Sequence, residues 1–433
     1  MPERAHPGHS SEPAVTTATT IRVRVLLATL VMLLPAGPAA FAAARQVDAY
    51  HWTGVERIVA IGDLHGDYQS YLLTLRTAGL IDERDQWSGG KTHLVQLGDI
   101  PDRGADTLQI IAHMKKLAAQ AKRKGGHVHN LMGNHEAMNT YGDLRYVSAG
   151  EFAAFAGRDS AQLRDRYYEN VLADIKARDP AAFANLPENH REEWNRSHPL
   201  GWVEHQQAWN PKWNPKGEYF EWVMDTEVAI QINDLVFLHG GLSSGYCRNS
   251  LSSLTDKARA ALRESDPATP DILTDELGPL WYRGLSGVEP VASDETVEAI
   301  LAQHGARHIV VGHTPTEGAI WPRYSARVIQ VDTGLSEYYG GHVGYLEVSG
   351  DTLYAGYPNG RVALPGSDAE RPDYLRKVMS LQPGNTGLQK QLDALQVAAS
   401  ATSAEDSGQD SASTPASESA ATVSDQPICG ISP

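Results

Sequence analysis

The chain shows a regular alternation of apolar and amphipathic segments from about residue 57. Short, mostly apolar runs at Arg57–Ile61, Leu94–Leu97 and Val128–Met132 have the length and composition of buried strands. Between them, Tyr68–Thr77 and Ala105–Lys124 carry apolar residues at helical spacing. This alternation predicts βαβ units with a parallel sheet. Because ligands of such sheets bind beyond the carboxyl ends of the strands, we expect the functional residues there.

The second half of the chain has a similar pattern. Val228–Ile232 and Leu235–Leu238 flank Asn233 and Asp234, which predicts a hairpin. The pattern further predicts a helix at Thr296–His304, a strand at Ile309–Val311, and a β-meander that comprises Arg327–Val331 and His342–Val362. Together these elements predict a second sheet, and therefore a sandwich of two sheets with helices outside.

Five short polar blocks directly follow predicted strands. They are Gly62–Gly66, Gly98–Gly104, Gly133–Glu136, His239–Gly241 and Gly312–Thr314. The blocks bring carboxylates, an amide and imidazoles to the edge of a sheet. This combination of oxygen and nitrogen donors suits a pair of divalent metal ions. One such block would be a weak signal, whereas five in order are a strong one.

The residues within these blocks differ in what they offer a metal ion. Asp63 and His65 are two positions apart at a strand end, so both side chains point the same way and can bind one ion. The carboxylate of Asp99 can bridge two ions. The neutral donors are the amide oxygen of Asn134 and the imidazoles of His239 and His313. Because neutral donors limit the negative charge of the cluster, we expect it to stay electropositive enough to accept an anion.

The five blocks resemble those of the PPP-type calcineurin-like metallophosphoesterases, the family of the serine/threonine phosphoprotein phosphatases, from about Arg57 to about Ser336. The resemblance implies an α/β (α+β) fold, a four-layer α/β/β/α sandwich with a mostly helical insertion. It also implies two divalent ions, with manganese expected and iron or zinc as alternatives. The resemblance assigns the first ion to Asp63, His65 and Asp99, and the second to Asp99, Asn134, His239 and His313.

The same resemblance implies roles for four further residues. His135 would be the general acid that protonates the leaving oxygen, and Asp102 would accept a hydrogen bond from its ring. Arg103 and Arg283 would bind the phosphoryl oxygens. The alternative for Asp102 and Arg103 is a surface pair with a role in a turn. We interpret Asp332 as a turn residue at a strand end rather than as a residue that orients a metal ligand.

Two departures separate the chain from the eukaryotic serine/threonine phosphatases. The C-terminal Ser-Ala-Pro-Asn-Tyr block is missing, and Asp332–Tyr339 occupies that region. Met132 stands where an arginine often precedes the Gly-Asn-His-Glu block. These differences are closer to the Shewanella-type bacterial branch, so regulatory subunits and inhibitor sensitivity do not follow from the resemblance.

The resemblance therefore implies a metal-dependent phosphoric ester hydrolase. We expect an exported phosphomonoesterase, a protein phosphatase (Ser/Thr or Tyr) or an enzyme for a small phosphoester, in which a metal-bridging hydroxide attacks phosphorus in line. The alternative enzymes are a phosphodiesterase and a dinucleoside polyphosphate hydrolase, although export argues against cytoplasmic nucleotides as substrates. A catalytically dead metal-binding module is disfavoured because all six ligands, His135 and Asp102 are present.

The N-terminal region has the order of a secretory signal peptide. Arg22 and Arg24 precede the apolar run Val25–Leu34, and small residues follow as far as Ala44. The run is short for a membrane span. We therefore expect cleavage near Ala44, a periplasmic or secreted mature protein, and no stable membrane insertion after cleavage. The alternative is an uncleaved signal anchor.

Composition predicts the organisation of the remaining chain. We expect a linker at residues 45–56 and the metallophosphoesterase domain at residues 57–395. Within the domain, residues 137–227 form an insertion rich in charge and tryptophan, mostly helical at Glu151–Ala184. The insertion is either a cap beside the active site or a structural segment with tryptophans in its core. Residues 396–433 are rich in alanine, serine, threonine and acid, which predicts a disordered tail.

The net charge narrows the classes of partner, and the cysteine content limits the possible disulfides. The 433-residue chain has a formal net charge of −16, so a general nucleic-acid surface is not expected. An anionic phosphoprotein or small phosphoester remains the expected substrate, because metal ions and a few arginines dominate the local field. The two cysteines, Cys247 and Cys429, either pair in an oxidising compartment or remain free thiols.

Overall fold

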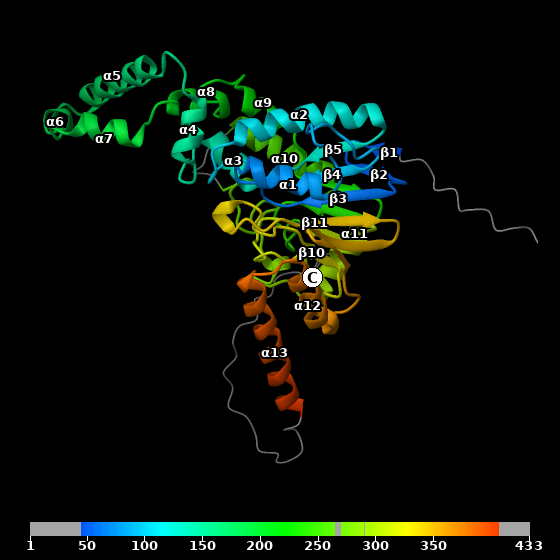
Figure 1. Ribbon diagram of the computed structural model, residues 1–433. Helices are drawn as coiled ribbons and strands as arrows, with labels where there is room; N and C mark the ends of the chain where they lie inside the picture. Colours follow the sequence, from blue (N-terminus) through cyan, green and yellow to red (C-terminus); the bar gives the residue numbers. More distant parts are fainter. Residues whose placement is uncertain (1–44, 265–269, 290, 407–433) are drawn as a thin grey trace, which may run out of the picture. The chain divides into compact units, whose positions relative to one another are not determined.

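Two mixed β-sheets form the centre of the computed structural model, which describes residues 45–264, 270–289 and 291–406 (Figure 1). The strands of one sheet are β3 (Arg57–Ile61), β4 (His93–Gln96), β5 (His127–Asn130), β11 (Tyr345–Ser349), β12 (Thr352–Tyr357) and β13 (Gly360–Ala363). We call it the first sheet; its order is β13-β12-β11-β3-β4-β5. As predicted, β3, β4 and β5 are parallel.

The other sheet, which we call the second sheet, contains the predicted hairpin. Its strands are β1 (Arg45–Asp48), β2 (His51–Thr53), β6 (Ala229–Ile232), β7 (Leu235–Leu238), β8 (His308–Val311), β9 (Trp321–Arg323) and β10 (Val328–Gln330). Their order is β1-β2-β6-β7-β8-β10-β9. β6 and β7 are antiparallel around Asn233, whose φ of +54° gives the tight reversal, and β7 runs parallel to β8.

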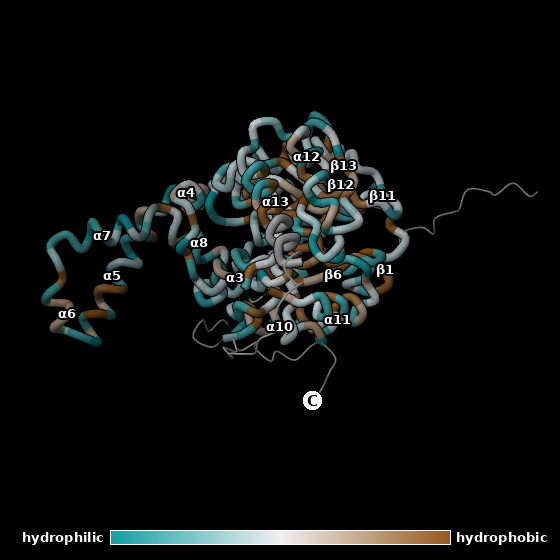
Figure 2. The backbone as a smooth tube through the Cα atoms, turned by 90° about the horizontal axis from the view of Figure 1, so that it is seen from below, coloured by the Kyte–Doolittle hydropathy of each residue, from teal (hydrophilic) through white to brown (hydrophobic). Residues whose placement is uncertain are grey.

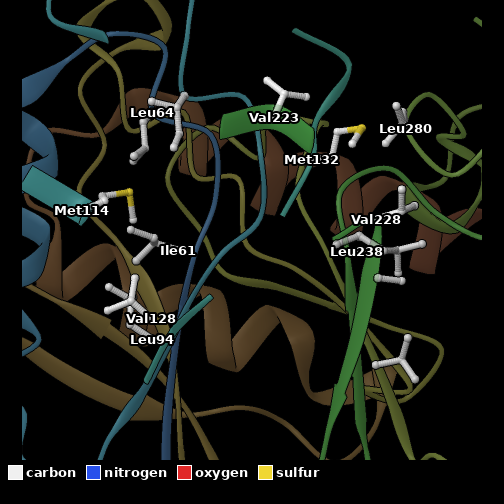
Figure 3. Close-up of a cluster of buried hydrophobic side chains, with 14 of the residues drawn as sticks. Ile61, Leu64, Leu94, Met114, Val128, Met132, Val223, Val228, Leu238 and Leu280 are labelled. Carbon is white, nitrogen blue, oxygen red and sulfur yellow. The ribbon is translucent and has the colours of Figure 1, made fainter. Parts of the chain in front are cut away.

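Alternation along the strands produces four layers and confirms the predicted α/β/β/α sandwich. In β3, Ile58 and Ala60 pack between the two sheets, whereas Val59 and Ile61 belong to the core beneath the outer helices. These helices are α1 (Tyr68–Thr77) and α2 (Thr107–Lys124) beside the first sheet, and α10 (Leu251–Glu264) and α11 (Asp294–His304) beside the second. Figure 3 shows Ile61 and Leu94 beside Met114 of α2, so the strands that lead into the polar blocks are anchored by apolar packing.

The predicted linker at residues 45–56 is wrong, because this segment forms β1 and β2. The two strands pair with each other, and Trp52 of β2 lies opposite Ile232 of β6 in the second sheet. Trp52 is buried, and its ring centroid is 4.5 Å from that of His129. The buried side chains of Trp52 and Val55 anchor this short segment, whose three- and four-residue strands carry too little periodicity to be recognised.

The predicted β-meander is also corrected, because its strands belong to different sheets. β10 pairs with β8 and β9 in the second sheet, whereas β11 pairs with β3 and β12 in the first. The connecting segment therefore crosses from one sheet to the other. It includes the short 3₁₀ helix η2 (Glu337–Tyr339), which this crossing brings to the carboxyl ends of the strands.

The insertion is helical beyond the predicted range. Its helices are α4 (Ala149–Phe155), α5 (Ser160–Arg178), α6 (Pro180–Ala184), α7 (His190–Ser197), α8 (Trp202–Trp209) and α9 (Glu218–Met224). Figures 1 and 2 show α5, α6 and α7 lying away from the sheets, whereas α4 and α8 lie between these three helices and the rest of the molecule. α9 contacts α8 and α3 (Asn134–Tyr141). Trp209 and Trp222 are buried in the main core, so these two tryptophans have a structural role.

The C-terminal helices correct the start of the predicted tail. The segment comprises η3 (Asp368–Glu370), α12 (Arg371–Leu381) and α13 (Thr386–Asp406), so α13 extends into the region predicted to be disordered from residue 396. Leu388 and Leu392 are buried against the core between the sheets, and this contact anchors a helix whose continuation contains no proline or glycine before Asp406.

Several predictions concern residues outside the described ranges. They are the signal peptide and cleavage site at residues 1–44, the tail at residues 407–433, and the pairing of Cys429 with Cys247, which is itself buried. Among the helices that the structure describes, none has both the length and the apolar character needed to cross a bilayer.

Candidate metal centre and active site

The polar blocks meet where the two sheets present the carboxyl ends of their parallel strands. β3, β4 and β5 lead to Asp63, Asp99 and Asn134. In the second sheet, β7 and β8 lead to His239 and His313. The backbone N–H of His313 donates to Oδ1 of Asp63 at 3.0 Å, which joins the two sheets directly at the site.

Asp99 lies at the centre of this group. Its Oδ2 is 4.0 Å from Nε2 of His65 and 3.2 Å from Nε2 of His239. On the first side, Nε2 of His65 is also 3.8 Å from Oδ2 of Asp63. On the second side, Nε2 of His239 is 3.0 Å from both Oδ1 of Asn134 and Nδ1 of His313. The structure therefore brings all six predicted ligands together, in two groups that share Asp99.

Backbone carbonyls orient two of the imidazoles. Nδ1 of His239 donates to the carbonyl oxygen of Leu97 at 2.7 Å, and Nδ1 of His65 donates to that of Pro101 at 3.2 Å. Because a carbonyl oxygen can only accept, each Nδ1 carries the proton and each Nε2 directs its lone pair into the cluster. This arrangement prepares both rings to bind a cation.

The cluster fits divalent cations because its acceptor atoms converge without enough donors among the described residues. Nε2 of His313 is buried and lacks a hydrogen-bond partner within the described chain. Burial, followed by the negative charges of Asp332 and Asp99, raises the pKa of Asp63 well above its usual value. Burial and the neighbouring His135 lower the pKa of His65 to about 3, so its ring is neutral at physiological pH. Cations would relieve this crowding of lone pairs and negative charge.

Backbone strain is concentrated at the same place. Positive φ angles occur at His65 (+43°), Asp99 (+58°), Asp102 (+74°), Arg103 (+67°) and His313 (+64°). Non-glycine residues rarely adopt this conformation, and they persist in it where the surrounding structure holds them. Half of the ten predicted site residues are therefore in a conformation that is typical of functional sites.

Glu136 holds the backbone around Asp99 by hydrogen bonds, a role that the sequence did not lead us to predict. It lies in the first turn of α3 (Asn134–Tyr141) and accepts hydrogen bonds from the backbone N–H groups of Asp99, Ile100 and Gly133 at 2.8–2.9 Å. Burial and the nearby Asp99 raise the pKa of Glu136 to about 7. Its place three residues after Gly133, the residue before the helix, was the available signal.

His135, Asp102 and Asn139 form a connected unit beside the predicted ligands. Nδ1 of His135 donates to Oδ2 of Asp102, whose Oδ1 accepts from Nδ2 of Asn139 at 3.0 Å. Nε2 of His135 therefore faces the cluster, 3.8 Å from Oδ2 of Asp99. Burial lowers the pKa of His135, but the negative charges of Asp99 and Asp102 outweigh burial and raise it. The alternative of an exposed Asp102–Arg103 pair is wrong, because Asp102 is fully buried.

Asn139 was missed, although its position one helical turn after His135 was a usable signal. Its Nδ2 also donates to the backbone carbonyl of His135 at 2.9 Å.

The two predicted phosphate-binding arginines contact different residues around the cluster. Arg283 donates to the carbonyl oxygen of His313 and, at 3.0 Å, to Oγ1 of Thr314. The positive charge of Arg283 lowers the pKa of Asp63, so this arginine acts electrostatically on the cluster. Arg103 lies beside two aromatic rings, with Cζ 3.8 Å from the ring centroid of Tyr146 and 4.8 Å from that of Tyr338.

The insertion holds the loop that carries Asp102 and Arg103, which no motif indicated. The backbone N–H of Asp102 donates to Oε2 of Glu151 at 3.0 Å, and that of Arg103 donates to the carbonyl oxygen of Tyr146, also at 3.0 Å. Burial and the nearby Asp102 raise the pKa of Glu151 to about 8. The start of the insertion is thus part of the site.

Asp332 is buried near the predicted ligands. Its Oδ1 accepts the backbone N–H of Gly334 at 3.0 Å, which is the turn role that we expected. Burial raises its pKa to about 6, and its charge acts on Asp63.

Comparison with known proteins gives consistent similarities. The calcineurin-like phosphoesterase family matches residues 56–317. A protein of Schizosaccharomyces pombe without an assigned function is 30% identical over 67% of this chain and 77% of its own. Shewanella-like protein phosphatase 2 of Arabidopsis thaliana is 29% identical over 65% of this chain and 72% of its own. The crystal structure of a cold-active protein-tyrosine phosphatase from a Shewanella species is 29% identical and covers 74% of this chain and 83% of its own, with a TM-score of 0.54.

Proposed function

Because the chain belongs to the calcineurin-like phosphoesterase family, in the Shewanella-like branch of the PPP-type enzymes, we propose that it is a phosphomonoesterase that removes phosphate from proteins. The enzyme class itself, a metal-dependent phosphoric ester hydrolase of protein phosphatase type, follows from that membership. The observation that carries the finer proposal is the convergence of five donor side chains around a sixth, that of Asp99, with His135 directed at the same point.

The proposed cofactor is a pair of divalent cations. Asp63, His65 and Asp99 would hold one, and Asp99, Asn134, His239 and His313 the other. When bound, such ions activate water for in-line attack and stabilise charge on the phosphoryl oxygens. The donor set suits manganese, iron or zinc, and we propose manganese.

The side chains of the chain itself supply the remaining chemistry. His135 directs Nε2 into the site and would donate its proton to the leaving oxygen, while Asp102 holds Nδ1 and stabilises the protonated ring. The raised pKa of His135 favours the protonated form that a general acid requires. Arg103 and Arg283 would bind phosphoryl oxygens.

The leading substrate is phosphotyrosine in a protein. Support comes from the solved structure named as a protein-tyrosine phosphatase, and from the aromatic rings around the site. The ring centroid of Tyr339 is 5.3 Å from that of His65, and that of Tyr146 is 5.1 Å from that of His135. Phosphoserine or phosphothreonine in a protein is the alternative within the same reaction.

The test is to strip the protein of metal, reload it with manganese, and compare hydrolysis of p-nitrophenyl phosphate with that of bis-p-nitrophenyl phosphate. We expect metal-dependent preference for the monoester, followed by preference for phosphotyrosine over phosphoserine peptides. Preference for the diester would instead identify a phosphodiesterase. Absence of turnover with either compound would contradict the proposal.

We further propose that the enzyme acts outside the cytoplasm. This rests on the basic, apolar and small-residue order of residues 1–44 in the sequence. Amino-terminal sequencing of the exported protein should find a start near Arg45. A start at Met1 in a membrane fraction would favour the uncleaved anchor.

A further inference from the structure

The guanidinium of Arg103 lies over the rings of two tyrosines from distant parts of the chain. Its Cζ lies 3.8 Å from the ring centroid of Tyr146, in the insertion, and 4.8 Å from that of Tyr338, in η2. Nη1 also donates to the hydroxyl of Tyr338 at 3.4 Å. We propose that Tyr146 and Tyr338 are positioning residues that hold Arg103 for phosphoryl binding, an inference that rests on the proposed phosphatase function.

The stacking matters because the described residues offer Arg103 little other restraint. The neighbouring carboxylate of Asp102 pairs with His135 rather than with Arg103, and the buried Nε of Arg103 has no hydrogen-bond partner among the described residues. Aromatic contact engages the flat face of a guanidinium, and apart from the long bond from Nη1 to Tyr338 it leaves the N–H edges of Arg103 available. Those edges are the groups that bind two oxygens of a phosphate at once.

The backbone at Arg103 also requires support from the insertion. Asp102 and Arg103 are consecutive non-glycine residues with positive φ, and three contacts from Tyr146–Glu151 hold the segment Asp102–Gly104. The carbonyl of Tyr146 accepts the N–H of Arg103 at 3.0 Å, and Oγ of Ser148 donates to the carbonyl of Gly104 at 2.6 Å. Glu151 accepts the N–H of Asp102. The start of the insertion and the loop that carries Asp102 and Arg103 therefore form one structural unit.

The backbone that carries Tyr338, the second tyrosine, is held by a residue next to the polar block Gly62–Gly66. Oδ2 of Asp67, directly after Gly66, accepts the backbone N–H of Glu337 at 2.8 Å. Oγ of Ser336 accepts the N–H of Tyr338 at 3.3 Å. These bonds fix the backbone of η2, while Tyr338 as a whole remains 62% exposed. An exposed ring that is fixed over a phosphate-binding arginine is accessible to substrate.

The experiment measures KM, kcat and the binding of inorganic phosphate to the manganese-loaded full chain by calorimetry. Tyr146→Leu and Tyr338→Leu should each weaken phosphate binding and raise KM by about 5-fold, with less change in kcat, because a partly exposed cation–π contact is of this size. Tyr146→Phe retains the ring and should restore wild-type values. Equal loss of kcat and phosphate affinity in all three variants would contradict the proposal.

A matched control exists on the far strands of the first sheet. The guanidinium of Arg361 lies 4.3 Å from the ring centroid of Tyr354, an equivalent contact between β13 and β12. Tyr354→Leu should leave KM and phosphate affinity unchanged. A shift as large as that of Tyr146→Leu would show that loss of any such pair has this effect, and would overturn the proposal.

A double-mutant cycle tests whether the tyrosines act through Arg103. Arg103→Lys keeps the charge but loses the planar group that stacks, so Tyr146→Leu should have little further effect in that background. Additive effects would exclude action through Arg103. Tyrosine-dependent phosphate binding without turnover by the wild-type protein would leave this inference intact and reject the proposed function. Normal turnover that is insensitive to substitution of both tyrosines would support the proposed function and reject this inference.

Discussion

The metal-ligand cluster and the beginning of the insertion build the same site in different ways. The cluster is made of strand ends, with Asp99 at 1% and His239 at 0% exposure, and each ligand follows an apolar run in the sequence. The insertion contributes Tyr146 and Glu151 to a loop whose nearest site residue, Arg103, is far away in sequence. The first kind of contribution is specified by local pattern, and the second only by tertiary contact.

The largest effect should come from the residue shared by the two ligand groups. Asp99→Asn removes the charge that both groups use, so metal binding and turnover should fall together, with the rate reduced at least ~100-fold. Metal analysis and a rate measurement on the same sample test this. The matched control is Asp82→Asn, an exposed aspartate whose Oδ1 accepts two backbone N–H groups and which should change neither. Full activity in Asp99→Asn would contradict the assignment.

The next effect separates metal binding from proton transfer. His135→Asn should leave the metal content unchanged and lower kcat on about the 10²–10⁴-fold scale of general acid catalysis. The loss should be greatest for alkyl phosphates and smallest for p-nitrophenyl phosphate, whose leaving group needs little protonation. An equal loss for both leaving groups would rule out His135 as the acid.

A smaller effect on activity, together with a change in stability, should come from the insertion. The pKa of Glu151 is about 8 in the folded protein because of burial and the charge of Asp102, against about 4.3 unfolded. The folded state thus holds an extra proton between these values, and stability falls as pH rises through that window. Glu151→Gln keeps an acceptor for the N–H of Asp102 without titrating.

Thermal unfolding at pH 5 and pH 8 measures the difference. The free energy of unfolding of Glu151→Gln should increase relative to that of the wild type as pH rises, by at most about 1.4 kcal/mol per pH unit. The substitution should change KM less than Tyr146→Leu does. A pH-independent difference between the two proteins would show that Glu151 is ionised in the folded state.

The smallest effect on activity should come from histidines that are buried but belong to no polar block. His93 and His129 hydrogen-bond at 3.1 Å near Trp52, and burial lowers the pKa of His93 to about 4. Because the unfolded ring titrates near 6.5, the unfolded state binds more protons between these values, and stability should fall as pH drops from about 6.5 to about 4.

His93→Gln should reduce the loss of unfolding free energy between about pH 6.5 and about pH 4, by up to about 3 kcal/mol. It should leave turnover at pH 7.5 unchanged. Urea unfolding followed by tryptophan fluorescence measures it. A loss of turnover would show that histidine burial alone, without a polar block, affects the site.

These differences explain how far the sequence could predict the molecule. The parallel strands and the convergence of Asp63, Asp99 and His239 followed from apolar runs and strand geometry. The β1–β2 edge was not predictable, because Trp52 acts through contacts with residues distant in sequence. Tyr146 was missed for the same reason, since an isolated tyrosine in a charged insertion carries no local signal. Glu136 and Asn139 had local signals, because both lie within the first two turns of α3 beside the block.

The most direct test of the account is a metal titration. Protein stripped with a chelator is titrated with manganese, and bound metal and hydrolysis of p-nitrophenyl phosphate are measured at each addition. The account predicts no hydrolysis in the stripped protein, and a rate that rises until two ions are bound per chain. Full activity without metal, or saturation of both signals at one ion, would contradict the binuclear site centred on Asp99.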